Sequence, residues 1–139
     1  MIAYFDASSF LKLVIDEPGS AEAHETWVAA HRRLSSRLLY PEARAGLARA
    51  QRMQRITEPE LDAARARVEV YIEDTVLLDV THAISRHAGN LAEEHGLRAY
   101  DAVHLASVDA IADEVTVLVA ADGDLIRAAR TFGISTSAL

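Results

Sequence analysis

The stretch IAYFDASSFLKL, residues 2–13, joins two different patterns at a single acidic residue. The apolar run Ile2–Phe5 predicts a buried strand, and the helical spacing of apolar residues after Asp6 predicts a helix that runs to Leu13 or Val14. A carboxylate at such a junction is a common helix N-cap, so Asp6 alone says little about function. Its meaning depends on whether other acids occupy equivalent places further along the chain.

Short apolar runs alternate with longer helical patterns in the rest of the chain, which predicts an α/β fold. We expect a central parallel sheet of four or five short strands, sandwiched by helices. Two consecutive helices within residues 38–73 have no strand between them and are predicted to form a projecting helical hairpin. The other strands are expected at 34–36, 75–80, 115–120 and, as an edge strand, 133–136; the other helices are expected at 20–31, capped by Ser20, at 82–95, capped by Thr81 and ended by Gly96, at 100–112 and at 124–131.

The length predicts one domain over residues 1–139. Half of the residues are hydrophobic and 25% are charged, which is typical of a globular protein. No apolar run is long enough to predict a membrane span, and no signal peptide is expected. The absence of cysteine excludes disulfides, cysteine-based zinc sites and a thiol nucleophile, and it agrees with a cytoplasmic location. A net charge of −7 predicts no general attraction to nucleic acid. The arginines of residues 43–55 either contact phosphates or form a solvated helix face.

Acidic residues recur where the predicted strands end and the predicted helices begin. Asp122 follows a predicted strand as Asp6 does, and the carboxyl ends of parallel strands lie along one edge of a sheet, where ligands bind. Glu42 and Asp101 stand at the starts of two predicted helices. If those helices begin at the same edge, four carboxylates converge there, with Asp124 as a fifth.

Each of these acids also has an ordinary explanation, because carboxylates near helix N-termini cap free N–H groups and complement the helix dipole. Converging carboxylates, however, repel each other by roughly 1–4 kcal/mol per pair at about 4 Å. They therefore share a proton or bind a cation. An oxygen-only ligand set suits Mg²⁺ or Mn²⁺. Such ions polarise a phosphoryl oxygen and lower the pKa of bound water, which predicts metal-assisted phosphodiester hydrolysis.

Four segments carry a resemblance to a known family. The segments FDASSFLKL, YPEARAGLAR, HGLRAYDAVHLAS and VAADGDLIRAA resemble the PIN-domain ribonucleases, specifically the VapC toxins of bacterial toxin–antitoxin pairs. The resemblance covers nearly the whole chain and is most specific from Gly96 to Ser107. It implies a PIN-domain fold and a metal-dependent endoribonuclease, the toxin component of a type II toxin–antitoxin pair. It also implies a homodimer and a VapB-type antitoxin that wraps over the site.

The resemblance assigns roles to individual acids. Asp6 and Asp101 match the principal metal ligands of the family, Glu42 and Asp122 match the other two acids of its site, and Asp124 matches a position that is often acidic. The implied reaction is cleavage of RNA with Mg²⁺ or Mn²⁺. A metal-activated water attacks phosphorus and leaves 5′-phosphate and 3′-hydroxyl ends.

Three further residues bear on this site. Ser8 matches a hydroxyl that the family uses to support the loop after the first Asp. Ala120 departs from the family, because many relatives carry Thr or Ser two residues before the last Asp. His104 lies three residues after Asp101, on the same helical face. It either orients that acid or packs in the core as a hydrogen-bonded histidine.

Other magnesium-dependent α/β proteins fit the sequence poorly. A receiver domain requires a lysine after a late strand, and the only lysine is Lys12. A haloacid-dehalogenase-type phosphatase requires Asp-x-Asp at the first strand, where this chain has Asp6-Ala7-Ser8. The alternative from a different class is a catalytically silent PIN-like module that binds RNA or protein. Loss of site acids would favour this module, and none of them is lost.

Overall fold

The computed structural model describes residues 1–139 and contains five parallel strands in one sheet, with seven helices. The strand order is β3-β2-β1-β4-β5, so the first strand lies at the centre of the sheet. The strands are β1 (Ile2–Phe5), β2 (Arg32–Ser36), β3 (Val76–Leu78), β4 (Thr116–Ala120) and β5 (Ser135–Ala138). The helices are α1 (Ala7–Val14), α2 (Ser20–Ala29), α3 (Leu39–Arg52), α4 (Glu58–Glu73), α5 (His82–His95), α6 (Ala99–Asp109) and α7 (Gly123–Thr131). None of these helices combines the length and apolarity needed to cross a bilayer.

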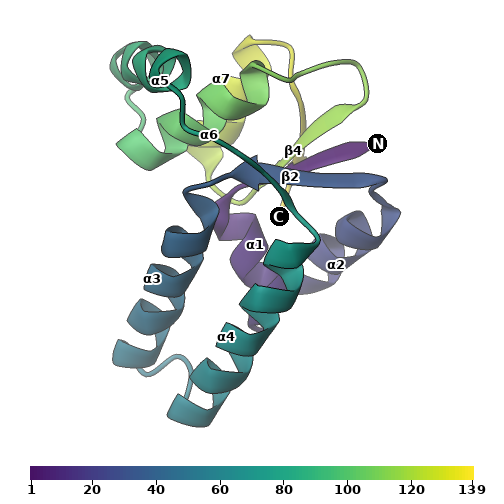
Figure 1. The fold of residues 1–139 in the computed structure, drawn as a ribbon, viewed down its shortest axis with the longest axis vertical. Coiled ribbons are helices and arrows are strands. Elements are labelled where there is room, and N and C mark those ends of the chain that lie inside the picture. Colours follow the sequence, from purple (N-terminus) through teal and green to yellow (C-terminus); the bar gives the residue numbers. More distant parts are fainter.

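Helices cover both faces of the sheet, as the ribbon in Figure 1 shows. Side chains of a strand point alternately to opposite faces. In β1, Tyr4 belongs to a core cluster built with α5, α6 and α7, whereas Ala3 and Phe5 belong to a second cluster built with α1 to α4. The central strand is therefore buried from both sides, as is usual for a parallel sheet. The predicted α/β sandwich is confirmed.

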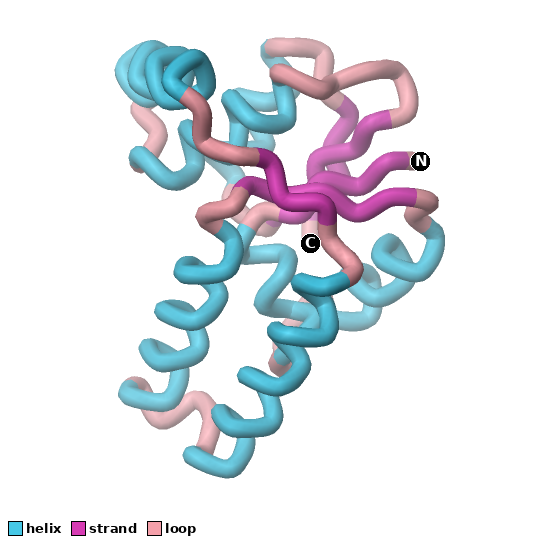
Figure 2. Tube along the Cα trace, viewed as in Figure 1, coloured by secondary structure: helices cyan, strands magenta, loops and turns pink.

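The predicted helical hairpin is also confirmed. Helices α3 and α4 follow each other without a strand and project together from the sheet (Figures 1 and 2). A capping box starts the second helix: Thr57 Oγ1 accepts from the Glu60 N–H at 3.2 Å, and Glu60 Oε1 accepts from the Thr57 N–H at 3.3 Å. These bonds satisfy two backbone donors that the helix itself leaves without partners.

Gly46 brings α3 close to α1. A Cβ atom at position 46 would lie only 2.7 Å from Cδ1 of Leu11, so any larger residue would displace that side chain. Glu42 lies one turn earlier on the same face of α3. The close approach of the two helices therefore holds α3, and Glu42 with it, against α1.

The predicted cap at Ser20 is wrong. Gly19 is the N-cap of α2, with a left-handed φ of 91°, and Ser20 is already the first helical residue. The Ser20 hydroxyl instead accepts from the Glu17 N–H at 3.1 Å and closes the turn before the helix. The helix starts one residue earlier than predicted, because Gly19 adopts a left-handed conformation that would strain most other residues. The caps at Thr81 and Gly96 are confirmed.

Candidate metal and active site

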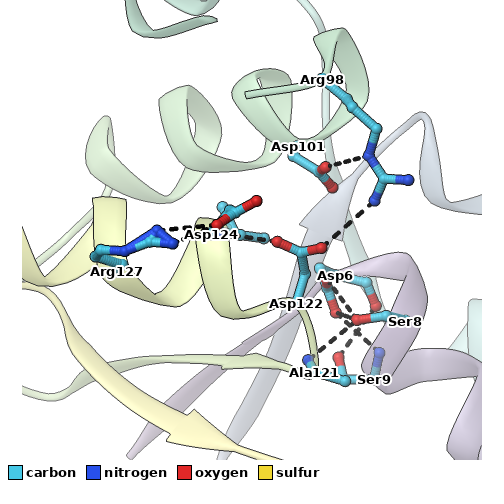
Figure 3. A network of polar contacts seen from close by, with 10 residues as sticks. Asp6, Ser8, Ser9, Arg98, Asp101, Ala121, Asp122, Asp124 and Arg127 are labelled. Atoms are coloured by element: carbon cyan, nitrogen blue, oxygen red, sulfur yellow. Dashed lines mark hydrogen bonds and ion pairs between the residues drawn. The ribbon is translucent and has the colours of Figure 1, made fainter. Parts of the chain in front are cut away.

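Four of the predicted acids line one cavity at the carboxyl edge of the sheet. Asp6 follows β1 and Asp122 follows the neighbouring strand β4, while Glu42 and Asp101 lie in the first turns of α3 and α6. The cavity has a volume of about 370 Å³. Asp124 lines an adjoining cavity instead (Figure 3). The structure thus brings Asp6, Glu42, Asp101 and Asp122 together and leaves Asp124 at their edge.

Asp6 is held in place by its own helix and is only 2% exposed. Its Oδ1 accepts from the Ser9 N–H at 2.8 Å, which caps α1. The Ser8 hydroxyl lies 2.7 Å from the other carboxylate oxygen and accepts from the Ala121 N–H at 3.1 Å. Ser8 therefore ties the loop after β1 to the loop after β4, the kind of loop support that the resemblance implies for this hydroxyl.

Burial raises the pKa of the Asp6 carboxyl above its ordinary value, although His104 and the hydrogen bonds from Ser9 and Ser8 act in the opposite direction. A carboxylate taken out of water in this way favours any change that neutralises it, either a proton or a nearby cation. No basic side chain forms an ion pair with Asp6. Among the acids of the cavity, Asp6 is therefore the one whose negative charge a bound ion would stabilise most.

Asp122 and Asp101 share a cationic neighbour. Asp122 Oδ1 accepts from the Leu125 N–H at 2.9 Å and caps α7. Its Oδ2 lies 3.5 Å from Nη2 of Arg98, whose Nε donates to Asp101 Oδ2 at 3.0 Å (Figure 3). Each of the two acids thus has a carboxylate oxygen that meets the same guanidinium.

Glu42 is held by a residue from another helix. His104, on α6, is 1% exposed, and its Nε2 donates to Glu42 Oε1 at 2.7 Å. Its Nδ1 lies 2.9 Å from the hydroxyl of Tyr4 on β1. The histidine is therefore a hydrogen-bonded core residue, as one of the two expectations held. It orients Glu42 and makes no hydrogen bond to Asp101.

The charge state of His104 follows from these neighbours. Burial acts to lower the pKa of its imidazole, but the hydrogen bond and the charge of Glu42, together with Asp6 and Asp101, outweigh burial and raise the pKa above its ordinary value. Burial also raises the pKa of the Tyr4 hydroxyl, which keeps it protonated. The same carboxylates that surround His104 therefore favour the protonated form of its imidazole.

We expect replacement of His104 by leucine to lower the free energy of unfolding by roughly 2–4 kcal/mol. The change leaves the Tyr4 hydroxyl and the largely covered Glu42 carboxylate without their partner, and such orphaned groups cost stability. Urea denaturation in chelator measures the loss. The double variant Tyr4→Phe/His104→Leu removes one orphaned group and should recover part of it. A His104→Leu variant as stable as wild type would contradict the assigned hydrogen bonds.

Arg98 is the residue that sequence reasoning missed. The arginines of residues 43–55, considered as phosphate contacts, do not line the acid cavity, whereas Arg98 does. A signal was present, because Arg98, Asp101 and His104 are spaced by three residues and so share a face of α6. That spacing places a basic residue one turn before and one turn after Asp101.

The side chains of the cavity fit a hard divalent ion in their chemistry. In this arrangement of side chains, no group of three acidic or histidine residues is positioned to bind one metal ion together. Their donor atoms are carboxylate oxygens, the type that Mg²⁺ and Mn²⁺ prefer. The buried Asp6 lacks a cationic partner, and Arg98 supplies the positive charge beside Asp101 and Asp122.

Comparison with known proteins places the chain in a family. The model described as PIN domain matches residues 3–131. Ribonuclease VapC45 of Mycobacterium tuberculosis is 43% identical over 132 residues, which are 95% of this chain and 92% of the relative. The crystal structure of PAE2754 from Pyrobaculum aerophilum shares the fold, with a TM-score of 0.72 and 21% identity over 98% of this chain and 92% of that chain. The crystal structure of DNA-bound VapBC from Salmonella typhimurium gives a TM-score of 0.69 and 15% identity over 99% and 98%. The chain therefore belongs to the VapC group of the PIN domain family.

Proposed function

We propose that this protein is a metal-dependent endoribonuclease and the toxin component of a type II toxin–antitoxin pair. The observation that carries the proposal is the meeting of Asp6, Glu42, Asp101 and Asp122 around one cavity, from four separate parts of the chain. The relatives that share 43% of the sequence bear the name ribonuclease, which supports the same reaction class.

In this proposal Asp6 and Asp101 would hold Mg²⁺ or Mn²⁺, and Glu42 and Asp122 would complete the site, with Asp124 at its rim. A bound ion supplies two effects, polarisation of a phosphoryl oxygen and a lower pKa for water. The ion would also offset much of the negative charge of the acids and present a positive charge of its own, so that an acidic cavity accepts an anionic phosphate.

The protein's own side chains position the reaction. The bonds from Ser9 and Ser8 fix the orientation of Asp6. His104 occupies Oε1 of Glu42 and leaves Oε2 without a protein partner, so Oε2 is the atom that accepts a proton from the attacking water. The expected products carry 5′-phosphate and 3′-hydroxyl ends.

The proposed partners follow from the family. A VapB-type antitoxin is proposed because structural neighbours are VapBC complexes, among them the DNA-bound one from Salmonella typhimurium. An RNA substrate, a homodimer and a cytoplasmic location complete the proposal.

We expect millimolar Mg²⁺ or Mn²⁺ to raise the melting temperature of the wild-type protein and to be required for cleavage of total RNA. An ion at 100 times its dissociation constant stabilises the folded state by about 2.7 kcal/mol, because it binds that state alone. Differential scanning calorimetry with and without chelator measures the first effect, and sequencing of RNA ends maps the second. Stabilisation by metal without any cleavage would favour the silent binding module.

A further inference from the structure

Arg98 is the only basic residue among those that line the acid cavity. It is the N-cap residue of α6, and its side chain is 78% exposed. The guanidinium donates to Oδ2 of Asp101 at 3.0 Å and to Oδ2 of Asp122 at 3.5 Å. Figure 3 shows it reaching both carboxylates from the side of α6.

These contacts contribute little to the stability of the fold. Water screens an exposed ion pair, so it contributes little to stability, and Arg98 makes no capping bond at the start of α6. Their effect is electrostatic, because a cation beside Asp101 and Asp122 relieves the repulsion between acids that share a cavity.

A divalent ion competes with this guanidinium for the same carboxylates. Arg98 meets Oδ2 of Asp101 and Oδ2 of Asp122, and both acids belong to the proposed metal site. A carboxylate neutralised by the ion attracts a guanidinium much less, and the two cations repel each other. Ion binding therefore releases the long side chain of Arg98 at the opening of the cavity. Released there, the guanidinium meets the phosphate of an entering substrate, which it binds with two parallel N–H donors.

We propose that Arg98 is a displaceable counter-cation that becomes a substrate-binding residue: it offsets part of the negative charge of Asp101 and Asp122 before the ion binds, and afterwards it binds a phosphate of the RNA backbone. This inference rests on the proposed nuclease function. It predicts opposite effects of one substitution on the two ligands, which a merely structural role of Arg98 would not produce.

The first measurement is titration calorimetry with Mn²⁺ on protein without RNA. Arg98→Ala should bind Mn²⁺ more tightly, by roughly 2- to 5-fold, since an exposed ion pair no longer competes. Arg98→Lys keeps the charge and should bind Mn²⁺ close to the wild-type level. The matched control is Arg65→Ala, because Arg65 also pairs with an aspartate three residues away on its helix, Asp62 on α4 at 3.2 Å, outside the cavity. It should change nothing.

The second measurement is steady-state cleavage of a defined RNA at saturating Mn²⁺. Arg98→Ala should raise KM by roughly 10-fold or more, the range expected for a charged hydrogen bond, with a smaller change in kcat. Arg98→Lys should lie between the two, because lysine lacks the paired donors of arginine.

Tighter Mn²⁺ binding combined with a higher KM in Arg98→Ala supports the inference. Weaker Mn²⁺ binding, or an unchanged KM in a variant whose wild-type parent cleaves RNA, overturns it and leaves the nuclease proposal standing. A wild-type protein that cleaves no RNA overturns the proposed function instead, and the Mn²⁺ titration then still decides whether Arg98 competes with the ion.

Discussion

Replacement of Asp101 by asparagine should reduce metal-dependent RNA cleavage by about 1000-fold or more, a loss of roughly 4 kcal/mol in transition-state stabilisation. The proposed role of Asp101 is to hold the ion through a charged oxygen, which an amide replaces poorly. The fold should remain intact. The carboxylate is mostly covered, and its only ion pair is with the exposed Arg98, which contributes about 0–1 kcal/mol.

The matched control for this change is Asp109→Asn. Asp109 lies on the same helix and pairs with His87 at 2.9 Å, outside the acid cavity. It should leave RNA cleavage at the wild-type level. Initial rates on a defined RNA, with circular dichroism to verify the fold, make the comparison. Cleavage undiminished in Asp101→Asn would remove the acid cavity as the active site.

Replacement of Asp6 by asparagine should likewise abolish cleavage. In chelator, however, it should raise the melting temperature of the protein, by roughly 2–8 °C for each kcal/mol by which the free energy of unfolding increases. Asparagine caps a helix about as well as aspartate, so the bond from the Ser9 N–H is kept. What disappears is a buried negative charge among other acids. A variant that loses activity and gains stability shows that the replaced residue serves the reaction and not the fold.

The gain in stability from Asp6→Asn should depend on pH. Because burial raises the pKa of Asp6 in the folded state above its unfolded value, folding favours the protonated acid. That contribution is fully present below the unfolded pKa and is lost as the pH rises through the folded pKa. The difference between the variant and wild type should therefore vanish in acid and grow toward neutral pH. Urea titrations in chelator at several pH values test it, and a difference constant with pH would contradict the burial of a charged Asp6.

The local parts of the fold were predictable from the sequence. The run Ile2–Phe5 followed by Asp6 marks both the end of a strand and a helix cap, and the structure has both. Asp122 could be placed for the same reason. The Ser20 cap failed because a preceding glycine supplied a conformation that side-chain preferences do not reveal.

The partners across the cavity were not predictable from the residues alone. The spacing of α6 puts His104 and Asp101 on one face, but only the packing of α3 against the sheet decides that the imidazole meets Glu42. Arg98 was overlooked because an exposed arginine at a helix start looks like an ordinary solvated residue. Which side chain faces which acid depends on contacts between distant segments, and helical periodicity carries no information about those.

The wide spread of the acids along the chain has a consequence for how the protein is made. Asp6 is synthesised well before Asp122, and the cavity between them exists only after β4 has paired with β1 and α7 has followed it. On the proposed function, a nascent chain still emerging from the ribosome is harmless to the RNA around it. Cleavage becomes possible only once β4 and α7 have been synthesised and have folded beside β1.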